Sequence, residues 1–483
     1  MFIHNKRTSR ITRSKSFPLQ ANEWFNRYQA LATHSKQHVL LESGRGGRFS
    51  IMGLDPFATL EGHDQTLTLS MGEEKQVWEG PLLKGIESAM EPFVVEPTQA
   101  VADIPFSGGA IGYFSYDVVR EIERIPSQSK DDLPLPDVYL MLFENVFVYD
   151  HHTEMIHLCV NGFAEEEEAL LLRLEMFESI WRQGSPTQTT WKQKEHTSDG
   201  SNTASLTEEE FVDAVNKIKS YIAQGDVFQV NLSLRESKPL TVEPMHVYEK
   251  LRELNPSPYM GYMQTPDFQL VSASPELLVK KQGDRLSTRP IAGTRSRGAT
   301  VEEDQRLADS LFVNEKERAE HVMLVDLERN DLGRVSSYGT VEVDELMVIE
   351  RYSHVMHLVS NVVGELADDH SVYDVIRAVF PGGTITGAPK IRTMEIIEEL
   401  ERVRRGIYTG AIGWIGFHGD MELNITIRTM ICYDEHAYVQ AGAGIVSDSN
   451  PHHEYKESFK KARALWRALE LSEEECKNVT QMS

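Results

Sequence analysis

Apolar residues recur at helical spacing most clearly in the segment that follows residue 206. Thr207 and Glu210 match the Ser/Thr-x-x-Glu pattern of a capping box, in which each side chain bonds the backbone amide of the other residue. Apolar positions then follow at intervals of three and four residues: Phe211, Val215, Ile218 and Ile222. Gly225 ends the pattern, and glycine often terminates a helix because it adopts left-handed backbone angles without a steric penalty. The pattern therefore predicts a helix over 207–225.

Other segments have the composition and alternation of β-strands. In the first half, β-prone runs at 108–114, 139–149 and 155–160 are separated by turn residues such as Pro134 and Pro136. The second half mixes helices and strands without the strict strand–helix alternation of a parallel sheet. This arrangement favours an antiparallel α+β fold.

The segments 408–417 and 421–433 flank a three-residue hairpin turn at 418–420. The second segment alternates cleanly, with Leu423, Ile425 and Ile427 on one face and Glu422, Asn424, Thr426 and Arg428 on the other. We expect one continuous strand that carries Arg428 on its polar face.

Two helical segments carry acids at spacings that bring them together. In segment 314–331 they are Glu317 and Glu320. After Asn450-Pro451 they are Glu454 and Glu457, with Lys461 one turn after Glu457. One interpretation is surface charge, since an exposed Glu457–Lys461 pair stabilises a helix by only about 0.2–0.5 kcal/mol. The alternative is metal binding, and carboxylates without Cys or His neighbours favour a hard ion such as Mg²⁺.

A Gly-rich segment at 380–390 has the glycine spacing of a phosphate-binding loop. Ala388-Pro389 occupies the positions where that loop needs Lys and Ser or Thr, so phosphate binding fails. The segment leads into a helix with Pro389 in its first turn, and a helix N-terminus favours an anion such as a carboxylate. Gly442-Ala443-Gly444 likewise either exposes backbone amides to a ligand or forms a tight turn.

Histidine and cysteine contribute little to a metal or nucleophile hypothesis. His354 and His357 lack the spacing of a zinc motif, and packed histidines are the simpler interpretation. None of Cys159, Cys432 and Cys476 lies in a G-x-C-x-G segment, and no G-x-S-x-G occurs. The chain therefore has no glutaminase or hydrolase nucleophile of its own.

Composition excludes several classes of protein. The 483 residues carry 49 Lys and Arg against 74 Asp and Glu, a net charge of −25, which argues against a nucleic-acid binder. No apolar run is long enough to span a membrane, and the cysteine count suits a cytoplasmic protein. The basic residues among the first 17 are interpreted as a short solvated arm. The polar segment 184–205 is predicted to be a linker between regions 1–183 and 206–472, with a tail at 473–483.

Taken together, these motifs resemble the chorismate-utilising enzymes, which include component I of aminodeoxychorismate synthase and of anthranilate synthase. The resemblance is dense from residue 207 to about 469, through segments 225–233, 274–276, 289–295, 355–357, 380–390 and 442–444. It implies an α+β fold with two facing antiparallel sheets and helices packed outside. It also implies that 206–472 is the chorismate-binding catalytic region.

The resemblance also implies a role for individual residues. Glu320 and Glu457 would bind Mg²⁺, with Glu317 and Glu454 nearby, and the ion would hold the ring carboxylate of chorismate. The substrate-binding residues would be Gly293, Thr294, Tyr408, Arg428, Gly442, Ala443, Gly444 and Lys461. Glu276 would be the general acid, and His357 and Thr384 would border the reacting ring. A tryptophan-type pocket would be lined by Ser43, Arg48, Phe49, Pro258, Tyr259 and Met260.

The product is left open between two reactions of chorismate with ammonia, which a separate glutamine amidotransferase subunit would supply. Ala292 occupies a position where many aminodeoxychorismate synthases carry Lys, which favours anthranilate and pyruvate. The Gly-Gly-Thr-Ile-Thr-Gly form of 382–387 and the short spacer from Ser43 to Arg48 favour 4-amino-4-deoxychorismate, a precursor of p-aminobenzoate and folate. We expect the latter product. A third hypothesis is a non-catalytic regulatory subunit that binds chorismate or tryptophan.

Overall fold

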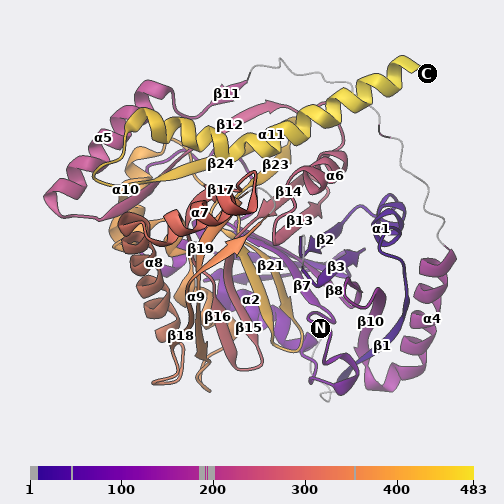
Figure 1. The fold of residues 1–483 in the computed structure, drawn as a ribbon. Helices are drawn as coiled ribbons and strands as arrows, with labels where there is room; N and C mark the ends of the chain where they lie inside the picture. Colours follow the sequence, from indigo (N-terminus) through magenta and orange to yellow (C-terminus); the bar gives the residue numbers. More distant parts are fainter. Residues whose placement is uncertain are drawn as a thin grey trace.

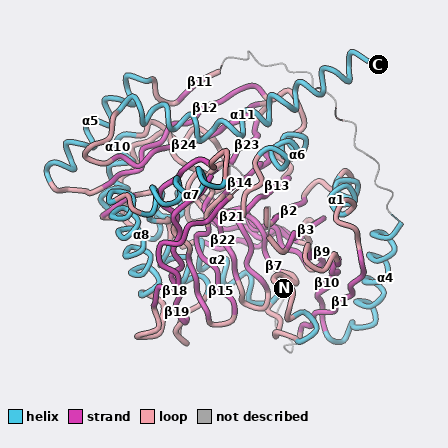
Figure 2. The backbone as a smooth tube through the Cα atoms, in the orientation of Figure 1, coloured by secondary structure: helices cyan, strands magenta, loops and turns pink. Residues whose placement is uncertain are grey.

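A computed structural model describes residues 9–44, 47–183, 191, 193, 202–352 and 355–482. In these ranges the chain forms two twelve-stranded sheets, and every strand pairing within them is antiparallel. Helices lie around the strands (Figure 1 and Figure 2). The predicted α+β fold with two antiparallel sheets is confirmed. Within the described ranges, no helix has the length and apolar character needed to cross a membrane.

The first sheet draws its strands from both halves of the chain. They are β1 (Arg10–Pro18), β2 (His38–Glu42), β3 (Phe49–Leu54), β9 (Asn145–Asp150), β10 (Met155–Phe163), β11 (Thr203–Ala204), β12 (Gln229–Pro239), β13 (Tyr259–Gln264), β14 (Phe268–Ser274), β20 (Gly387–Ala388), β23 (Thr429–Tyr433) and β24 (His436–Ile445). Their order is β1-β10-β9-β3-β2-β13-β14-β23-β24-β12-β11, and β20 also pairs with β12.

The second sheet likewise draws its strands from both halves of the chain. Its strands are β4 (Ala58–His63), β5 (Thr66–Met71), β6 (Glu74–Glu79), β7 (Gly109–Phe114), β8 (Val138–Phe143), β15 (Leu277–Gln282), β16 (Arg285–Thr288), β17 (Ile291–Ser296), β18 (Glu342–Arg351), β19 (Val355–Glu365), β21 (Ala411–Gly416) and β22 (Met421–Ile425). Their order is β17-β19-β16-β15-β22-β21-β7-β8-β4-β5-β6, and β18 pairs with β19.

The α-helices are α1 (Trp24–Ala32), α2 (Leu82–Met90), α3 (Val119–Ile122), α4 (Glu167–Gln183), α5 (Glu208–Gln224), α6 (Pro244–Leu254), α7 (Val301–Phe312), α8 (Glu315–Gly333), α9 (Val372–Val379), α10 (Lys390–Leu400) and α11 (Pro451–Met482). Short 3₁₀ turns are η1 (Glu91–Phe93), η2 (Gln99–Val101), η3 (Tyr116–Val118), η4 (Ala164–Glu166) and η5 (Gly383–Ile385). The predicted capping box is present at α5, where the Glu210 amide donates to Thr207 and Gly225 closes the helix with φ +82°.

Four pairs of consecutive strands pass directly from one sheet to the other: β3–β4, β8–β9, β14–β15 and β22–β23. At two of these crossings, a segment predicted from the sequence to be one continuous strand is divided into two strands. The run 139–149 breaks at Glu144 into β8 and β9, and the run 421–433 breaks after Ile425 into β22 and β23. Arg428 lies in the second break with φ +52°, so it ends the alternation rather than continuing it.

Between the sheets lies an apolar cluster to which both contribute, including Tyr113, Phe268 and Trp414. Tyr113 and Phe268 meet edge to face with ring centroids 5.9 Å apart. Because the apolar faces of both sheets are buried here, their relative placement is fixed.

Both ends of the chain are more ordered than the sequence predicted. Residues 10–18 form strand β1, paired with β10, and Arg10 is buried, so this part of the basic segment is not a solvated arm. At the other end α11 continues to Met482, and Cys476 is buried within the predicted tail. Most of the predicted linker, 184–205, lies outside the described residues. Trp191 within it stacks on His246 with ring centroids 5.3 Å apart.

Candidate active site

Two of the sheet crossings lie side by side and bring Glu276 and Arg428 to one place. The Ile425 amide donates to the Glu276 carbonyl at 3.0 Å, and the Ala273 amide donates to the Arg428 carbonyl at 3.0 Å. The Ser274 hydroxyl also donates to the Ile425 carbonyl at 2.6 Å. The β14–β15 and β22–β23 crossings are therefore bonded to each other.

Glu276 is the buried acid of this corner. Burial raises the pKa of its carboxyl to about 7, while the neighbouring Thr384 hydroxyl, the Ile291 amide and the Lys461 charge oppose the increase. Its carboxyl therefore holds a proton at a pH where an exposed glutamate would have lost it. A carboxyl that titrates near neutral pH is suited to donate a proton to a leaving group.

Lys461 supplies positive charge near Glu276, and Arg428 lies close enough to Lys461 to act on it. Burial lowers the pKa of the Lys461 ammonium, and the Arg428 charge adds to that effect. Lys461, from α11, donates to the Gly442 carbonyl on β24 at 2.8 Å. Burial also lowers the pKa of Arg428, which Glu457 and Tyr408 oppose. Two cations that repel each other at close range favour an anionic ligand such as a carboxylate.

The predicted metal-binding carboxylates face Lys461 from two helices. Glu457 and Glu454 on α11 and Glu320 on α8 all act to raise the pKa of Lys461. Burial raises the pKa of Glu320, and the charge of Glu317 one turn earlier adds to the increase. In the described part of the chain, no three His, Cys, Asp or Glu side chains are already arranged around one point as a metal would require. The oxygen donors themselves suit Mg²⁺, so the residues fit such an ion chemically.

Glu320 is oriented by a residue that the sequence analysis missed. Gln229, the first residue of β12, donates from Nε2 to Glu320 Oε1 at 3.0 Å. Glycine at 444 leaves room for this contact, because a Cβ there would come within 2.4 Å of Gln229 Nε2. The run Gly442-Ala443-Gly444 lies inside β24 and pairs with β12, so the tight-turn interpretation is wrong.

His357, on β19, lies beside the predicted substrate-binding residues Gly293 and Thr294. Its Nδ1 is 3.1 Å from both the Gly293 carbonyl oxygen and the Thr294 hydroxyl. Burial lowers the pKa of His357, so the ring is neutral, and an Nδ1–H donating to the Gly293 carbonyl satisfies this geometry. Gly293 forms a bulge in β17 with φ +63°, a backbone conformation that suits glycine. His354 lies outside the described residues.

The Gly-rich loop is held in place by a buried Arg405–Glu401 pair, which the sequence analysis also missed. Arg405 donates to the Ile385 carbonyl of η5 and to the Asn231 carbonyl of β12, each at 2.8 Å. It is also bonded to Glu401 at 2.7 Å, and its guanidinium lies over the ring of Tyr408. One side chain thus sets the positions of the loop that carries Thr384, of β12 and of Tyr408.

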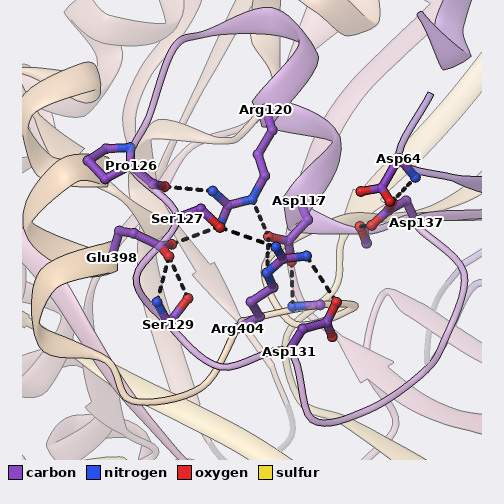
Figure 3. A network of polar contacts seen from close by, with 12 residues as sticks. Asp64, Asp117, Arg120, Pro126, Ser127, Ser129, Asp131, Asp137, Glu398 and Arg404 are labelled. Atoms are coloured by element: carbon purple, nitrogen blue, oxygen red, sulfur yellow. Dashed lines mark hydrogen bonds and ion pairs between the residues drawn. The ribbon is translucent and has the colours of Figure 1, made fainter. Parts of the chain in front are cut away.

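A segment of the N-terminal half secures the same region from outside (Figure 3). Glu398, at the end of α10, accepts bonds from Arg120 and from the Ser129 amide and hydroxyl, each at 2.7–2.8 Å. Arg404 reaches Asp131 at 3.0 Å. A segment of the N-terminal half therefore helps to hold the end of α10 and the residues that follow it.

Several buried polar atoms on these elements have no hydrogen-bond partner among the described residues. They are Gln229 Oε1, Asn231 Oδ1, Glu276 Oε1, Thr384 Oγ1 and Thr426 Oγ1. Buried polar groups are almost always paired in folded proteins, so such a group of unsatisfied atoms is typical of a binding site for a polar ligand.

A separate cavity of about 770 Å³ contains all six residues of the predicted tryptophan-type pocket, Ser43, Arg48, Phe49, Pro258, Tyr259 and Met260. Arg48 pairs with Asp150 at 3.0 Å and lies over the Phe49 ring at 4.6 Å. Lys280, Lys281 and Trp414 also line it.

Comparison with known proteins connects this geometry to a family. The sequence profile of the chorismate binding enzymes matches residues 36–467. Aminodeoxychorismate synthase component 1 of Bacillus subtilis (strain 168) is 55% identical over 463 residues, 96% of this chain and 98% of that protein. Anthranilate synthase component 1 of Acetivibrio thermocellus is 44% identical, covering 89% and 90%. The crystal structure of anthranilate synthase component I from Streptococcus pneumoniae TIGR4 superposes with a TM-score of 0.76 at 37% identity, over 87% of this chain and 92% of that one.

Proposed function

The chain belongs to the chorismate binding enzyme family, and from that premise we propose that it is component 1 of an aminodeoxychorismate synthase. It would convert chorismate and ammonia to 4-amino-4-deoxychorismate, the precursor of p-aminobenzoate. The observation that carries this choice of product is the 55% identity to an aminodeoxychorismate synthase component 1 across nearly the whole chain, against 42–49% for anthranilate synthase relatives.

The site residues support the chemistry of that reaction. Arg428 and Lys461 would bind the carboxylates of chorismate, and the position of Lys461 near Glu276 would place the ring against this acid. Glu276, whose pKa burial raises to about 7, would donate its proton to the departing C4 hydroxyl. His357 and Thr384 would border the ring, with His357 held neutral by burial. Tyr408, Gly293 and Thr294 would line the substrate side.

Glu320 and Glu457 would hold Mg²⁺, with Glu317 and Glu454 beside them. The ion, when bound, would neutralise the ring carboxylate and withdraw electron density from the ring. Gln229 prepares Glu320 for this role by fixing one of its carboxylate oxygens.

Ammonia would come from a separate glutamine amidotransferase subunit. The relatives are named as a component 1, which supports a second component, and the three cysteines of this chain are buried and lie outside any disulfide. Cysteines outside disulfides also fit the reducing conditions of the cytoplasm, where we place the protein.

The test is incubation with chorismate, Mg²⁺ and ammonium, followed by mass spectrometry of the product. We expect 4-amino-4-deoxychorismate, no release of pyruvate, and no reaction after removal of the metal with EDTA. Glu320→Gln should remain folded and be inactive. Stoichiometric pyruvate with anthranilate would contradict the assignment, and an inert but chorismate-binding protein would instead support a regulatory subunit.

Anthranilate synthesis is the second candidate because of one residue. Ala292, on β17, is 7% exposed and stands where many aminodeoxychorismate synthases carry Lys. If the product is 4-amino-4-deoxychorismate, ammonia must be the only nitrogen nucleophile. The same product analysis decides between the two reactions.

The cavity that contains Arg48 and Tyr259 is proposed as a tryptophan-type pocket. The six residues named from the sequence line one space large enough for an amino acid. Tryptophan at millimolar concentration should raise the melting temperature or inhibit turnover, and Met260→Trp should abolish the effect by filling the cavity. No response to tryptophan would make the pocket vestigial.

A further inference from the structure

Tyr352 lies where the cavity meets the active site. It lines the cavity of about 770 Å³, and its ring contacts the His357 ring with centroids 5.6 Å apart and planes inclined by 59°. The side chain is only partly buried. Because packing does not enclose the tyrosine ring on all sides, its hydrogen bonds help to determine where it lies.

Tyr352 is bonded at its backbone and at the far end of its ring. Its hydroxyl donates to Glu350 Oε2 at 2.5 Å. Its backbone amide donates to the Val355 carbonyl at 2.8 Å, and its carbonyl accepts from Arg297 Nη1 at 2.6 Å. These three bonds hold the tyrosine ring in one position against His357.

Glu350 connects Tyr352 to Arg289. Its Oε2 accepts from the tyrosine hydroxyl, and its Oε1 accepts from Arg289 Nε at 3.0 Å. Arg289 also pairs with Glu345 at 2.8 Å. Hydrogen bonds between charged groups are stronger than neutral ones, so Arg289 is a firm anchor for the carboxylate. Glu350 lies directly opposite His357 in the pairing of β18 with β19, which places this support beside the histidine.

The segment 289–294 therefore reaches His357 by two routes. At one end, the Gly293 carbonyl oxygen and the Thr294 hydroxyl each lie 3.1 Å from Nδ1 of the histidine. At the other end, Arg289 acts through the carboxylate and the tyrosine ring. The direct contacts involve a single ring nitrogen, whereas the tyrosine ring limits rotation of the imidazole about that point.

We propose that Tyr352, held by Arg289 through Glu350, is a positioning residue that sets the orientation of the His357 imidazole in the active site. This inference rests on the proposed function, in which His357 borders the reacting ring. Tyr352 exchanges no proton with the substrate and acts through His357. The proposal also gives a role to Arg289, whose segment resembles the family although the proposed reaction does not use this side chain. A reacting group is effective only when its neighbours hold it in the productive geometry.

The first test removes the tyrosine ring. Tyr352→Ala should lower kcat by roughly 10–100-fold, because small misplacements of a reacting group are costly, and should leave KM for chorismate nearly unchanged. Tyr352→Phe keeps the ring and loses the bond to Glu350, so its kcat should lie between those of the parent and Tyr352→Ala. The control is Tyr338→Ala, which removes a fully exposed tyrosine and should have the kcat of the parent.

Nuclear magnetic resonance of the substrate-free protein gives a readout that does not depend on activity. With nitrogen-15 in the histidine rings, and His357→Asn to assign the signal, the parent should show His357 with its proton on Nδ1, as the bond to the Gly293 carbonyl requires. In Tyr352→Ala the imidazole can rotate away from that carbonyl, so a mixture of the two tautomers is expected. A merely structural role for Tyr352 would lower the melting temperature and leave this signal unchanged.

Arg289→Met keeps the proposal testable if Tyr352→Ala folds poorly. It removes the anchor of Glu350 and leaves the tyrosine ring in the chain, so kcat should fall in the same direction but by less than in Tyr352→Ala. Arg285→Met is the matched control, since Arg285 lies on the preceding strand β16 and its exposed side chain pairs with Asp344. Its kcat and its His357 signal should be those of the parent.

The outcomes separate this inference from the proposed function. A parent that does not aminate chorismate, but whose His357 tautomer is disturbed in Tyr352→Ala, would end the proposed function and leave the positioning role standing. A folded Tyr352→Ala protein with the kcat of the parent would overturn the positioning role alone. So would a reduced kcat with an unchanged His357 signal, because the effect would then not pass through the histidine.

Discussion

At the scale of single residues, burial is the largest influence on the charged groups of the site. It raises the pKa of Glu276 and Glu320 and lowers the pKa of Arg428 and Lys461, so each is shifted toward its neutral form. Binding an anionic substrate beside Arg428 and Lys461 would restore their preference for positive charge. The site is thus electrostatically incomplete without its ligand.

Glu276 should make the activity fall as the pH rises. A general acid must be protonated, and this carboxyl loses its proton as the pH rises through about 7. We therefore expect kcat/KM for chorismate to fall on the alkaline side, once corrected for the fraction of free NH₃. Glu276→Gln should lower kcat by roughly 10²–10⁴-fold. A variant that retains parental kcat would remove Glu276 from the reaction.

Glu276 also affects stability. Its folded pKa lies above the ordinary value of 4.5, so the protonated carboxyl contributes stability that is complete below about pH 4.5 and is lost as the pH rises through about 7. Denaturant unfolding at pH 5 and pH 8 should show a smaller difference for Glu276→Gln than for the parent. Equal differences would show that the group titrates normally.

Lys461 is expected to act on substrate binding. Replacing it with Met removes a charged hydrogen-bond donor, which is typically worth about 1.5–3 kcal/mol, so KM for chorismate should rise roughly 10–100-fold. Lys477→Met, at an exposed position further along the same helix α11, is the matched control and should bind as the parent does. Steady-state kinetics at saturating ammonium would detect the difference.

Which acidic side chains are buried could not be predicted from the sequence. Glu317 and Glu320 were found because they share a helix face, but Glu328 lies on the same helix among acids that range from exposed, such as Glu315 and Asp326, to buried, such as Asp331. Its burial depends on β16, which is about 40 positions earlier in the chain. No local pattern distinguishes it from Glu315 or Asp326.

At the scale of helices and strands, the sequence predicted those features that depend on contacts between neighbouring residues, such as the starts of helices. The capping box at Thr207 and the start of α11 at Pro451 were confirmed, since the bonds that form them join neighbours in sequence. The crossing between β22 and β23 was missed because its segment contains neither Gly nor Pro. Its causes are the long-range bonds of Ile425 to Ser274 and Glu276.

The Glu401–Arg405 pair allows a prediction about an element. Arg405→Met would leave Glu401 buried without its cation, bonded only to the Ser233 amide and hydroxyl, and would free the Ile385 and Asn231 carbonyls, at a cost of about 3–5 kcal/mol. Denaturant unfolding should show this loss. The control is Arg402→Met, whose side chain is exposed and pairs with Glu210, and its stability should change by less than about 1 kcal/mol.

The same pair also orders the loop that carries Thr384, so a milder variant should separate stability from catalysis. Glu401→Gln keeps hydrogen bonding to Arg405 and should retain more stability than Arg405→Met. A folded Glu401→Gln protein with reduced kcat and unchanged KM would support the ordering role, whereas parental kcat would argue against it.

At the scale of the whole molecule, the proposed reaction uses ammonia, and the cysteines of this chain do not suit a glutaminase that would release it. All three are about 1% exposed, and burial raises the pKa of Cys159 to about 12 and also raises that of Cys476, which disfavours a nucleophilic thiolate. Glutamine should therefore give no turnover with this chain alone. Ammonium should work best at a pH that balances free NH₃ against protonated Glu276. Product formation from glutamine by the purified chain would contradict the need for a partner.

The four strand crossings have a consequence for how such a protein can be rearranged. Strand β21 of the second half pairs with β7 of the first, and β13 pairs with β2, so neither half has a complete sheet of its own. A gene truncated at the polar segment would yield a product with unpaired strand edges that aggregates rather than folds. Recombination between relatives would succeed only when partner strands are inherited together. We therefore expect such a chain to evolve as one unit, because its halves are not separable modules.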